Sequence, residues 1–245
     1  MIRLPVNFGG FVSISTVDWP GRAVCTVFLR GCPVRCFYCQ NTPLLSGNDM
    51  RDEDEIVAMI SESALVVSGV VFSGGEPTMQ GEALVNLARE SRRLGLAIGV
   101  HTNGVYPHVL ERLIDEGLID HVALDIKARW ERYARLFGVD LVDRVKESLA
   151  LCRTAYLERR LPELEVVVTL FRGYEDEVSS IAREAAGVPL VLQQGVFGDV
   201  VPLTFEELAA VAAKTGRTCR IRTRESGEQE YEADWSCGTA GKRQG

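Results

Sequence analysis

One stretch of the chain reads Val24-Cys25-Thr26-Val27-Phe28-Leu29-Arg30-Gly31-Cys32-Pro33-Val34-Arg35-Cys36-Phe37-Tyr38-Cys39. It begins with a short apolar run, which leads directly into a tight loop that contains three cysteines. The run Val24–Leu29 is nearly continuous in hydrophobicity, which is typical of a parallel strand that is buried on both faces. The loop has the spacing Cys-x3-Cys-x2-Cys, one thiolate short of what a four-iron cluster needs, so one iron would keep an open coordination position. A structural zinc site with a distant fourth ligand and plain core thiols are the alternatives at this point.

The chain on both sides of this loop alternates apolar runs with amphipathic runs. Further strands are expected near Val70–Phe72, Leu96–Val100, His121–Ile126, Leu164–Leu170 and Leu190–Leu192. Helices are expected near Asp52–Ser63, Gly81–Leu94, Pro107–Glu116, Leu141–Arg153, Glu175–Ala186 and Phe205–Thr215. Right-handed crossovers place such helices outside the sheet. The sequence therefore predicts an α/β fold, an incomplete parallel (β/α)6 barrel, with one further strand at Cys219–Thr223.

Both ends of the chain depart from this alternation. An apolar opening at Phe11–Ile14 precedes the turn signal Asp18-Trp19-Pro20-Gly21, which predicts a short N-terminal hairpin. We divide the chain into a hairpin extension over residues 1–23, a partial barrel over residues 24–223 and a C-terminal tail over residues 224–245.

Composition narrows the possible functions. The 245 residues carry 27 basic and 34 acidic side chains, and the net charge of −7 argues against nonspecific binding to nucleic acid. The N-terminus lacks an apolar signal segment, and no apolar run approaches the ~18 residues of a membrane span. We therefore expect a cytoplasmic protein that does not bind membranes.

The seven cysteines fit a reducing compartment, where thiols stay free for metal and disulfides are not expected. Outside the loop, Cys25, Cys152 and Cys219 stand singly in apolar or helical settings, which predicts buried core positions. The setting of Cys237 stays open. No second Cys-x2-Cys pair occurs, so an added ferredoxin-like domain is not expected.

Unusual residues follow four of the predicted strands. They are Cys32–Cys39 after the first, Ser73-Gly74-Gly75-Glu76-Pro77 after the second, His101-Thr102-Asn103-Gly104 after the third, and Asp125-Ile126-Lys127 at the end of the fourth. Parallel barrels build their chemistry on the loops at the carboxyl ends of the strands. One rim of the barrel should therefore collect all four segments.

This order of motifs resembles the radical S-adenosylmethionine (SAM) superfamily over roughly residues 8 to 195. In that superfamily Cys-x3-Cys-x2-Cys holds a [4Fe-4S] cluster and a Gly-Gly-Glu-Pro loop holds SAM. The segment Thr16-Val17-Asp18-Trp19-Pro20-Gly21-Arg22 looks most like activases of glycyl radical enzymes, above all the short form that activates anaerobic ribonucleotide reductase. The resemblance implies an oxidoreductase that cleaves SAM to a 5′-deoxyadenosyl radical and installs a glycyl radical on that partner. It also implies a low-potential electron donor such as flavodoxin or ferredoxin.

The resemblance implies a catalytic set of four residues. Cys32, Cys36 and Cys39 would ligate the iron-sulfur cluster. Asp18 matches the acid of a turn that lies near the glycine-bearing loop of the partner, although an Asx role that stabilises its own turn is the alternative.

Further residues match the cofactor site of the family. Gly74 and Gly75 lack Cβ atoms, so backbone can approach the methionine part of SAM, and Glu76 can accept a hydrogen bond from its ammonium group. Tyr38 would lie beside the adenine and Asn103 would bond the ribose. The alternatives are ordinary turns for the glycines, Glu76 and Asn103, and core packing for Tyr38.

Asp125 and Lys127 match residues near the SAM carboxylate, with a structural ion pair as the alternative. His101 is a departure, because many activases carry an acid at this position that helps to bind a monovalent cation. Imidazole is a poor ligand for a hard cation, so that cation site is in doubt, or a direct histidine contact to the cofactor replaces it.

Two other function classes compete with the activase. A radical enzyme acting on a small molecule, similar to carboxy-deazaguanine synthases, would need polar residues in a closed pocket. The late strands offer for this only Gln193 and Gln194, against apolar Val166, Val168 and Leu192. A non-enzymatic iron-sulfur protein would not need the Gly-Gly-Glu-Pro loop.

Overall fold

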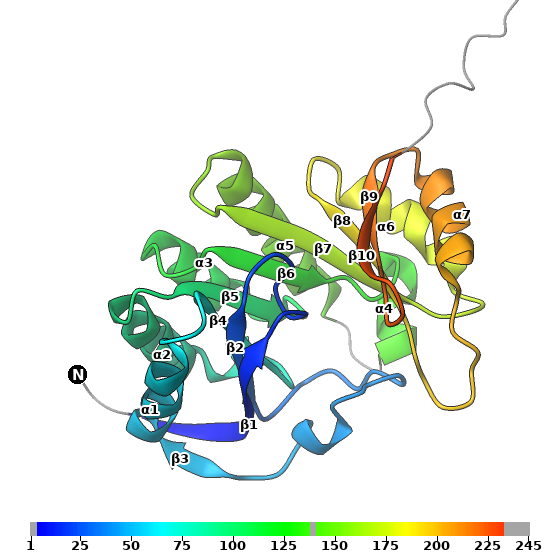
Figure 1. Cartoon of the computed structure of the whole chain (residues 1–245). Coiled ribbons are helices and arrows are strands. Elements are labelled where there is room, and N and C mark those ends of the chain that lie inside the picture. Colours follow the sequence, from blue (N-terminus) through cyan, green and yellow to red (C-terminus); the bar gives the residue numbers. More distant parts are fainter. Residues whose placement is uncertain (1–3, 138–140, 233–245) are drawn as a thin grey trace, which may run out of the picture.

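The computed structural model describes residues 4–137 and 141–232, and in this part of the chain seven strands run parallel in one curved sheet (Figure 1). Their order across the sheet is β2 (Val24–Leu29), β4 (Gly69–Gly74), β5 (Ala97–Thr102), β6 (His121–Asp125), β7 (Glu163–Leu170), β8 (Leu190–Gln194) and β9 (Cys219–Thr223). The six predicted strands and the further strand at Cys219–Thr223 are all confirmed, with shifts of a few residues at their ends.

Antiparallel strands extend the sheet at both sides. Beyond β2 lie β1 (Pro5–Ser15) and β3 (Met50–Asp52), and beyond β9 lies β10 (Gly227–Tyr231). β3 and β10 form the two edges of the sheet, so the barrel is not closed in the described residues. This confirms the predicted incomplete barrel with its N-terminal hairpin, which β1 and β2 form together.

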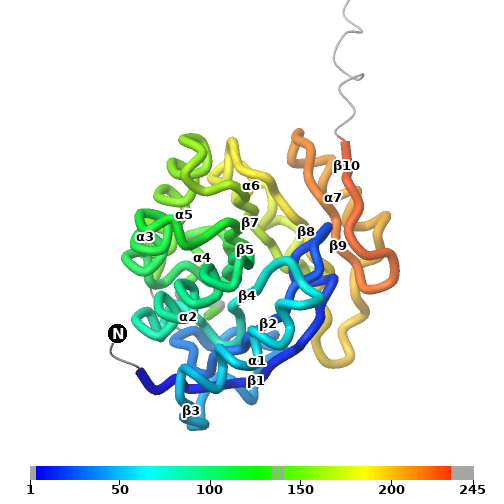
Figure 2. Tube along the Cα trace, turned by 60° about the vertical axis from the view of Figure 1, so that its left-hand side comes forward, coloured from blue at the N-terminus to red at the C-terminus, as the bar shows by residue number. Residues whose placement is uncertain are grey.

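Helices lie on the outer side of the curved sheet (Figure 2). They are α1 (Glu53–Ser63), α2 (Gly81–Arg93), α3 (Pro107–Asp115), α4 (Trp130–Phe137), α5 (Val142–Leu157), α6 (Val178–Glu184) and α7 (Phe205–Thr215). Short 3-10 turns occur at Thr42–Leu44, Pro77–Gln80 and Glu175–Glu177. The sequence analysis missed α4, β3 and β10.

Local sequence signals explain where α7 begins and ends. Thr204 accepts a hydrogen bond from the backbone of Glu207, whose carboxylate accepts one from the Thr204 backbone in return, at 3.2 and 2.9 Å. This capping box satisfies two backbone donors that the helix itself leaves free. Gly216 ends the helix in the left-handed conformation, with φ of 64°.

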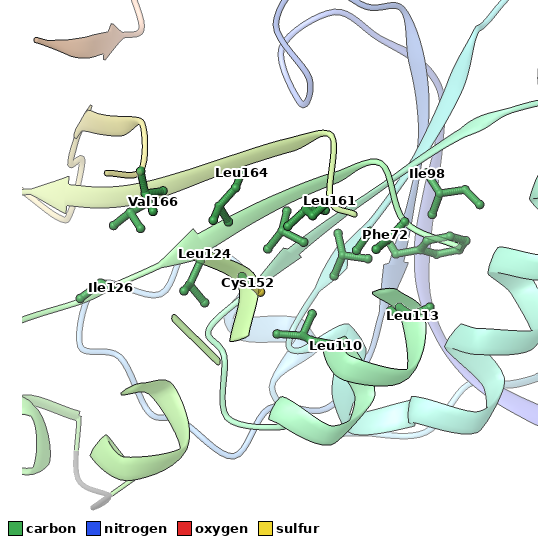
Figure 3. Close-up of a cluster of buried hydrophobic side chains, with 14 of the residues drawn as sticks. Phe72, Ile98, Leu110, Leu113, Leu124, Ile126, Cys152, Leu161, Leu164 and Val166 are labelled. Carbon is green, nitrogen blue, oxygen red and sulfur yellow. The ribbon is translucent and has the colours of Figure 1, made fainter. Parts of the chain in front are cut away.

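The main core lies between the sheet and the outer helices. In Figure 3, Leu124, Leu164 and Val166 from two neighbouring strands point toward the helix side, where Leu110 and Cys152 meet them. All five side chains are at most 2% exposed. Shortening one of the leucines to alanine should cost about 2–5 kcal/mol of stability. Cys25, Cys152 and Cys219 are all buried, as the sequence predicts.

The connection between β1 and β2 lies at the amino-terminal ends of β6 and β7, opposite the rim that carries the cysteines. Trp19 is 2% exposed, its ring stacks on His121 at 4.7 Å, and its indole N–H donates to Glu163 at 2.9 Å. His121 and Glu163 are the first residues of β6 and β7. The Asp18-Trp19-Pro20-Gly21 turn therefore covers the beginnings of two parallel strands.

Residues 227–231, which the division of the chain assigned to the C-terminal tail, form β10 against β9. Cys237 lies outside the described residues. Within residues 4–137 and 141–232, no helix has the length and apolar character that crossing a membrane requires.

Candidate active site

The loops that follow β2, β4, β5 and β6 meet at one rim of the sheet. The loop after β4 pairs with the end of β2, because Gly75 N donates to Leu29 O and Glu76 N donates to Gly31 O, each at 2.8 Å. The loop after β5 joins them, because Asn103 N donates to Glu76 Oε2 at 2.7 Å. The structure thus brings together the motif residues that the sequence places after separate strands.

The cysteine loop, Gly31–Cys39, is folded tightly on itself. Cys39 N donates to Cys36 O at 3.2 Å, and the Arg35 guanidinium donates to Cys32 O. Cys32 is 8% exposed, and Cys36 and Cys39 are partly buried. Burial raises the pKa of Cys32, and it raises the pKa of Cys36 to about 11. The thiolates of Cys32 and Cys36 therefore need a positive partner such as iron.

The three thiols are free cysteines in the structure. In the described part of the chain, no three His, Cys, Asp or Glu side chains are gathered as ligands of a single metal ion.

Gly74 and Gly75 allow the glutamate loop, Ser73–Pro77, to pack on the end of β2. A Cβ atom on Gly74 would lie under 3.0 Å from the Leu29 backbone, and one on Gly75 equally close to the Gly31 carbonyl. Gly74 also has φ of 123°, a conformation that side chains rarely adopt. Close backbone contact therefore requires both glycines, Gly74 against the end of β2 and Gly75 against the cysteine loop, a reason that the sequence alone did not show.

Glu76 is the centre of the rim and is 1% exposed. Oε1 accepts hydrogen bonds from Thr78 N at 3.0 Å, from the Thr78 hydroxyl, and from the Thr102 hydroxyl at 2.7 Å. Oε2 accepts one hydrogen bond, from Asn103 N. Burial raises the pKa of Glu76, and these hydrogen bonds oppose that effect. Oε2 keeps the capacity for a second donor.

Asn103 lies between the glutamate loop and the cysteine loop. Its side chain is buried, with Oδ1 accepting from Val105 N at 3.2 Å and Nδ2 placed 3.6 Å from Cys32 Sγ. Ser148 on α5 supports this turn by donating to Gly104 O at 2.7 Å. The structure thus directs an amide N–H of Asn103 at a cysteine sulfur.

Asp125, Lys127 and Tyr38 lie together beside the cysteine loop. Lys127 forms an ion pair with Asp125 Oδ2, and its ammonium is 5.8 Å from the centre of the Tyr38 ring. Burial alone would lower the pKa of Lys127, but Asp125 leads the neighbouring groups that together outweigh it, so the pKa is raised well above its usual value. Asp125 Oδ1 and the Tyr38 hydroxyl are buried with no protein partner in the described residues. A polar ligand at this position would satisfy both groups.

Asp18 and His101 belong to the interior of the barrel. Asp18 Oδ2 accepts a hydrogen bond from Thr26 on β2 at 2.7 Å, and its backbone N donates to Ser15. The His101 ring lies 6.2 Å from the His121 ring. Burial, reinforced by His121, lowers the pKa of His101, which favours a neutral imidazole.

Polar residues share the inner face of the late strands with an apolar cluster of Ala123, Val167 and Val191, so the expected shortage of polar residues is not found there. Val166, Val168 and Leu192 belong to the main core, on the helix side of the sheet, so the alternate residues of these strands face inward. The inward set includes Glu163, Glu165, Thr169, Gln193, Arg220 and Arg222. The period-two alternation in Glu163-Leu164-Glu165 and in Arg220-Ile221-Arg222 was the signal that would have identified them.

The inner-face arginines are neutralised by carboxylates. Glu165 contacts Arg220 at 2.6 Å and Arg222 at 3.2 Å, and Glu228 on β10 contacts Arg220 at 2.9 Å and Arg222 at 2.6 Å. Burial alone would raise the pKa of Glu165, but Arg222 leads the charges that outweigh it, so the pKa is lowered. Two cations and two anions therefore balance within this cluster.

The chain is similar to a known family and to several known proteins. The family model for the radical SAM superfamily matches residues 26–185. A Methanocaldococcus jannaschii protein, provisionally named a glycyl-radical enzyme activating enzyme, is 32% identical over 182 residues, 71% of this chain and 73% of the relative. Pyruvate formate-lyase 1-activating enzyme of Escherichia coli K12 is 33% identical over 183 residues, 71% of both chains. A 7-carboxy-7-deazaguanine synthase of Pyrobaculum aerophilum is 38% identical over 101 residues, 39% of this chain and 44% of that enzyme.

Among solved structures, TYW1 with a lysine-pyruvate adduct bound has the same fold, with a TM-score of 0.64 at 17% identity over 85% of this chain and 79% of TYW1. The superfamily uses a [4Fe-4S] cluster and SAM, and the rim described above offers thiols, an unpartnered carboxylate oxygen and an unpartnered hydroxyl that fit these groups. On the family match and the two activating-enzyme relatives, this chain belongs to the radical SAM superfamily.

Proposed function

We propose that Cys32, Cys36 and Cys39 ligate a [4Fe-4S] cluster whose fourth iron binds SAM. The observation that carries this proposal is the convergence of the four loops, tied by the hydrogen bonds from Gly75 to Leu29 and from Asn103 to Glu76. The sulfurs of a single tight loop can serve three irons, which leaves the fourth open.

The residues around the cysteine loop supply the groups that SAM needs. Oε2 of Glu76 has room for one more donor, which fits the ammonium group of the methionine part. Asp125 Oδ1 and the Tyr38 hydroxyl have no protein partner in the described residues, and the buried Lys127 places a positive charge against Asp125 Oδ2 and 5.8 Å from the centre of the Tyr38 ring. We assign these side chains to SAM binding, together with backbone at Gly74, Gly75 and Asn103.

We further propose that the chain activates a glycyl radical enzyme, specifically an anaerobic ribonucleotide reductase, in the cytoplasm. When bound, the cluster and SAM supply one-electron cleavage of a sulfur–carbon bond of SAM, and the hydrogen atom taken from the partner's glycine ends on 5′-deoxyadenosine. The electron must come from a low-potential donor such as flavodoxin or ferredoxin. The two activating-enzyme relatives support the general activity, and the segment Thr16–Arg22 supports this particular partner.

The inner face of the barrel favours a substrate without net negative charge. Arg220 and Arg222 are both paired with Glu165 and Glu228, and Lys127 is paired with Asp125. A small carboxylate substrate would have to compete with these pairs for its cation. A glycine in a polypeptide needs hydrogen-bonding groups only, and Thr169 and Gln193 offer them on neighbouring strands.

A second candidate is a radical SAM enzyme acting on a free small molecule. The polar inner face favours it, because the shortage of pocket residues expected from the sequence is not found. The similarity to 7-carboxy-7-deazaguanine synthase also favours it, although that match covers less than half of either chain.

One experiment separates these functions. The anaerobically reconstituted, reduced protein is mixed with SAM and with either anaerobic ribonucleotide reductase or pyruvate formate-lyase, and electron paramagnetic resonance monitors the glycyl radical. A radical on the reductase, followed by nucleotide reduction, supports the proposal, whereas a radical on the lyase alone changes the partner. Turnover of a free small molecule with stoichiometric 5′-deoxyadenosine, and no protein radical, would establish the second candidate instead.

A further inference from the structure

We infer that Asn103 is a positioning residue that donates an N–H···S hydrogen bond to Cys32 and thereby raises the reduction potential of the iron-sulfur cluster. The inference rests on the proposed ligation of the cluster by Cys32. It gives Asn103 a role different from the ribose contact that the family resemblance implies.

The orientation of the Asn103 amide is determined by its neighbours. Val105 N can only donate, so the atom that faces it at 3.2 Å must be the carbonyl oxygen Oδ1. The amino group Nδ2 then necessarily faces Cys32 Sγ at 3.6 Å. Both side chains are buried, at 5% and 8% exposure, so water competes little for this contact.

The backbone of Asn103 is also held in place. Glu76 Oε2 accepts its N–H at 2.7 Å, and the same carboxylate binds the preceding Thr102 hydroxyl at 2.7 Å. On the other side, Ser148 donates to Gly104 O, and Gly104 has the positive φ of 75° that this turn requires. Glu76 and α5 thus keep the amide aimed at the sulfur, so the donor costs little additional ordering when the cluster forms.

The expected electrostatic effect has a definite sign. A donor at a ligating sulfur stabilises negative charge on the cluster, and the reduced cluster carries one more negative charge than the oxidised one. The hydrogen bond therefore favours reduction, in line with the general influence of hydrogen bonds to cluster sulfurs on the potential. Because the contact is buried, the effect is not screened by solvent.

The test compares the midpoint potentials of reconstituted wild-type and variant proteins without SAM. Asn103→Leu removes the donor at similar size, and Asn103→Ser replaces it with a hydroxyl too short to reach the sulfur. Asn86→Leu is the matched control, because Asn86 is equally buried but donates to Glu53, on α1, at 3.0 Å. In both Asn103 variants the equilibrium constant for reduction of the cluster should fall by up to about tenfold, which lowers the midpoint potential by up to ~59 mV for a one-electron couple.

A second measurement on the wild-type protein does not depend on the folding of any variant. Resonance Raman bands of the iron–cysteine bonds should shift when the amide hydrogens are exchanged for deuterium, and the shift should shrink in Asn103→Ser. Potentials of both Asn103 variants equal to that of Asn86→Leu would overturn the inference, as would wild-type bands insensitive to deuterium. Wild-type protein that takes up no iron would instead refute the proposed cluster, so the two failures are distinguishable.

Discussion

Replacing Gly75 by alanine tests whether the rim is built by contact between the glutamate loop and the cysteine loop. The new Cβ would lie under 3.0 Å from the Gly31 carbonyl oxygen. The backbone fixes the position of the Cβ, and the oxygen belongs to the main chain, so rotation of a side chain cannot relieve the overlap. The loops must separate, which stretches the two hydrogen bonds Gly75 N to Leu29 O and Glu76 N to Gly31 O, both 2.8 Å long.

The size of the effect follows from these contacts. Losing two backbone hydrogen bonds costs about 1–3 kcal/mol at roughly 0.5–1.5 kcal/mol each, and the residual overlap adds about 1–3 kcal/mol. The expected loss of stability is therefore about 2–6 kcal/mol. The displaced cysteine loop should also take up less iron, because its three sulfurs no longer match the cluster.

Chemical denaturation of the metal-free variants measures the first effect, and iron content after anaerobic reconstitution measures the second. Gly117→Ala is the control, because Gly117 has a positive φ of 64° but nothing within 4 Å of its would-be Cβ. It should lose only about 1–2 kcal/mol through backbone strain. A Gly75→Ala protein that is as stable as this control and takes up full iron would refute the reasoning. If Gly75→Ala lost only affinity for SAM, the requirement for glycine at this position would be explained by close approach of the cofactor instead.

Four further predictions concern single side chains. Cys32→Ala, Cys36→Ala and Cys39→Ala should each abolish the cluster in iron assays, whereas Cys152→Ala should keep about four irons per chain. Glu76→Gln should weaken SAM binding about ten- to a hundredfold, because a charge-assisted hydrogen bond worth ~1.5–3 kcal/mol is lost. The cluster should be retained, and a titration with SAM that follows the cluster spectrum measures the change in affinity. Asp18→Asn should impair glycyl radical formation more than SAM binding, and a purely structural Asp18 would instead show as lost stability with normal radical yield. The lowered pKa of Glu165 means that its ion pairs stabilise the fold fully above about pH 4.3, the usual pKa of glutamate. This stabilisation is lost as the pH falls through the pKa of Glu165 in the folded protein. Glu165→Gln should therefore remove this part of the pH dependence of the free energy of unfolding.

The parallel core was predictable because its residues carry a strong local signal. Val24–Leu29 and Cys219–Thr223 are found with the predicted bounds, since a buried parallel strand needs a short apolar or alternating run whatever its partners are. β10 was not predictable in this way. The segment Gly227-Glu228-Gln229-Glu230-Tyr231 is polar except for Tyr231, which packs against the main core. It forms a strand because β9 supplies the hydrogen-bonding edge and Arg222 lies opposite Glu228.

Helix α4 was missed for a different reason. Trp130–Phe137 is only two turns long, and although Trp130, Tyr133 and Phe137 recur at helical spacing, so short a segment was not assigned as a helix from the sequence. Its aromatic residues pack in a second core with Tyr38 and Phe171, next to the cysteine loop. Tertiary contacts therefore hold this helix, and they depend on a loop that is distant in sequence.

The residues of the rim were predictable as a set, but their contacts were not. Motif order placed Glu76 and Asn103 after neighbouring strands, and the register of a parallel sheet brings such residues together. Which atoms then meet depends on the backbone turns, and these cannot be read from the sequence. Gly75, which contacts the cysteine loop, and Asn103, which faces a cysteine sulfur, therefore look in the sequence like cofactor-binding residues only.

The inner face of the barrel changes the argument about the substrate. Val166, Val168 and Leu192 suggested an apolar interior, yet they face the helices, and their neighbours Glu165 and Gln193 face inward. The number of polar residues on the inner face therefore does not distinguish a glycine loop of a partner protein from a small molecule as the substrate. The balance of charge does so instead, because each inward arginine already contacts two carboxylates. A small anion would have to compete with Glu165 and Glu228 for these arginines, whereas a neutral peptide backbone leaves the pairs intact.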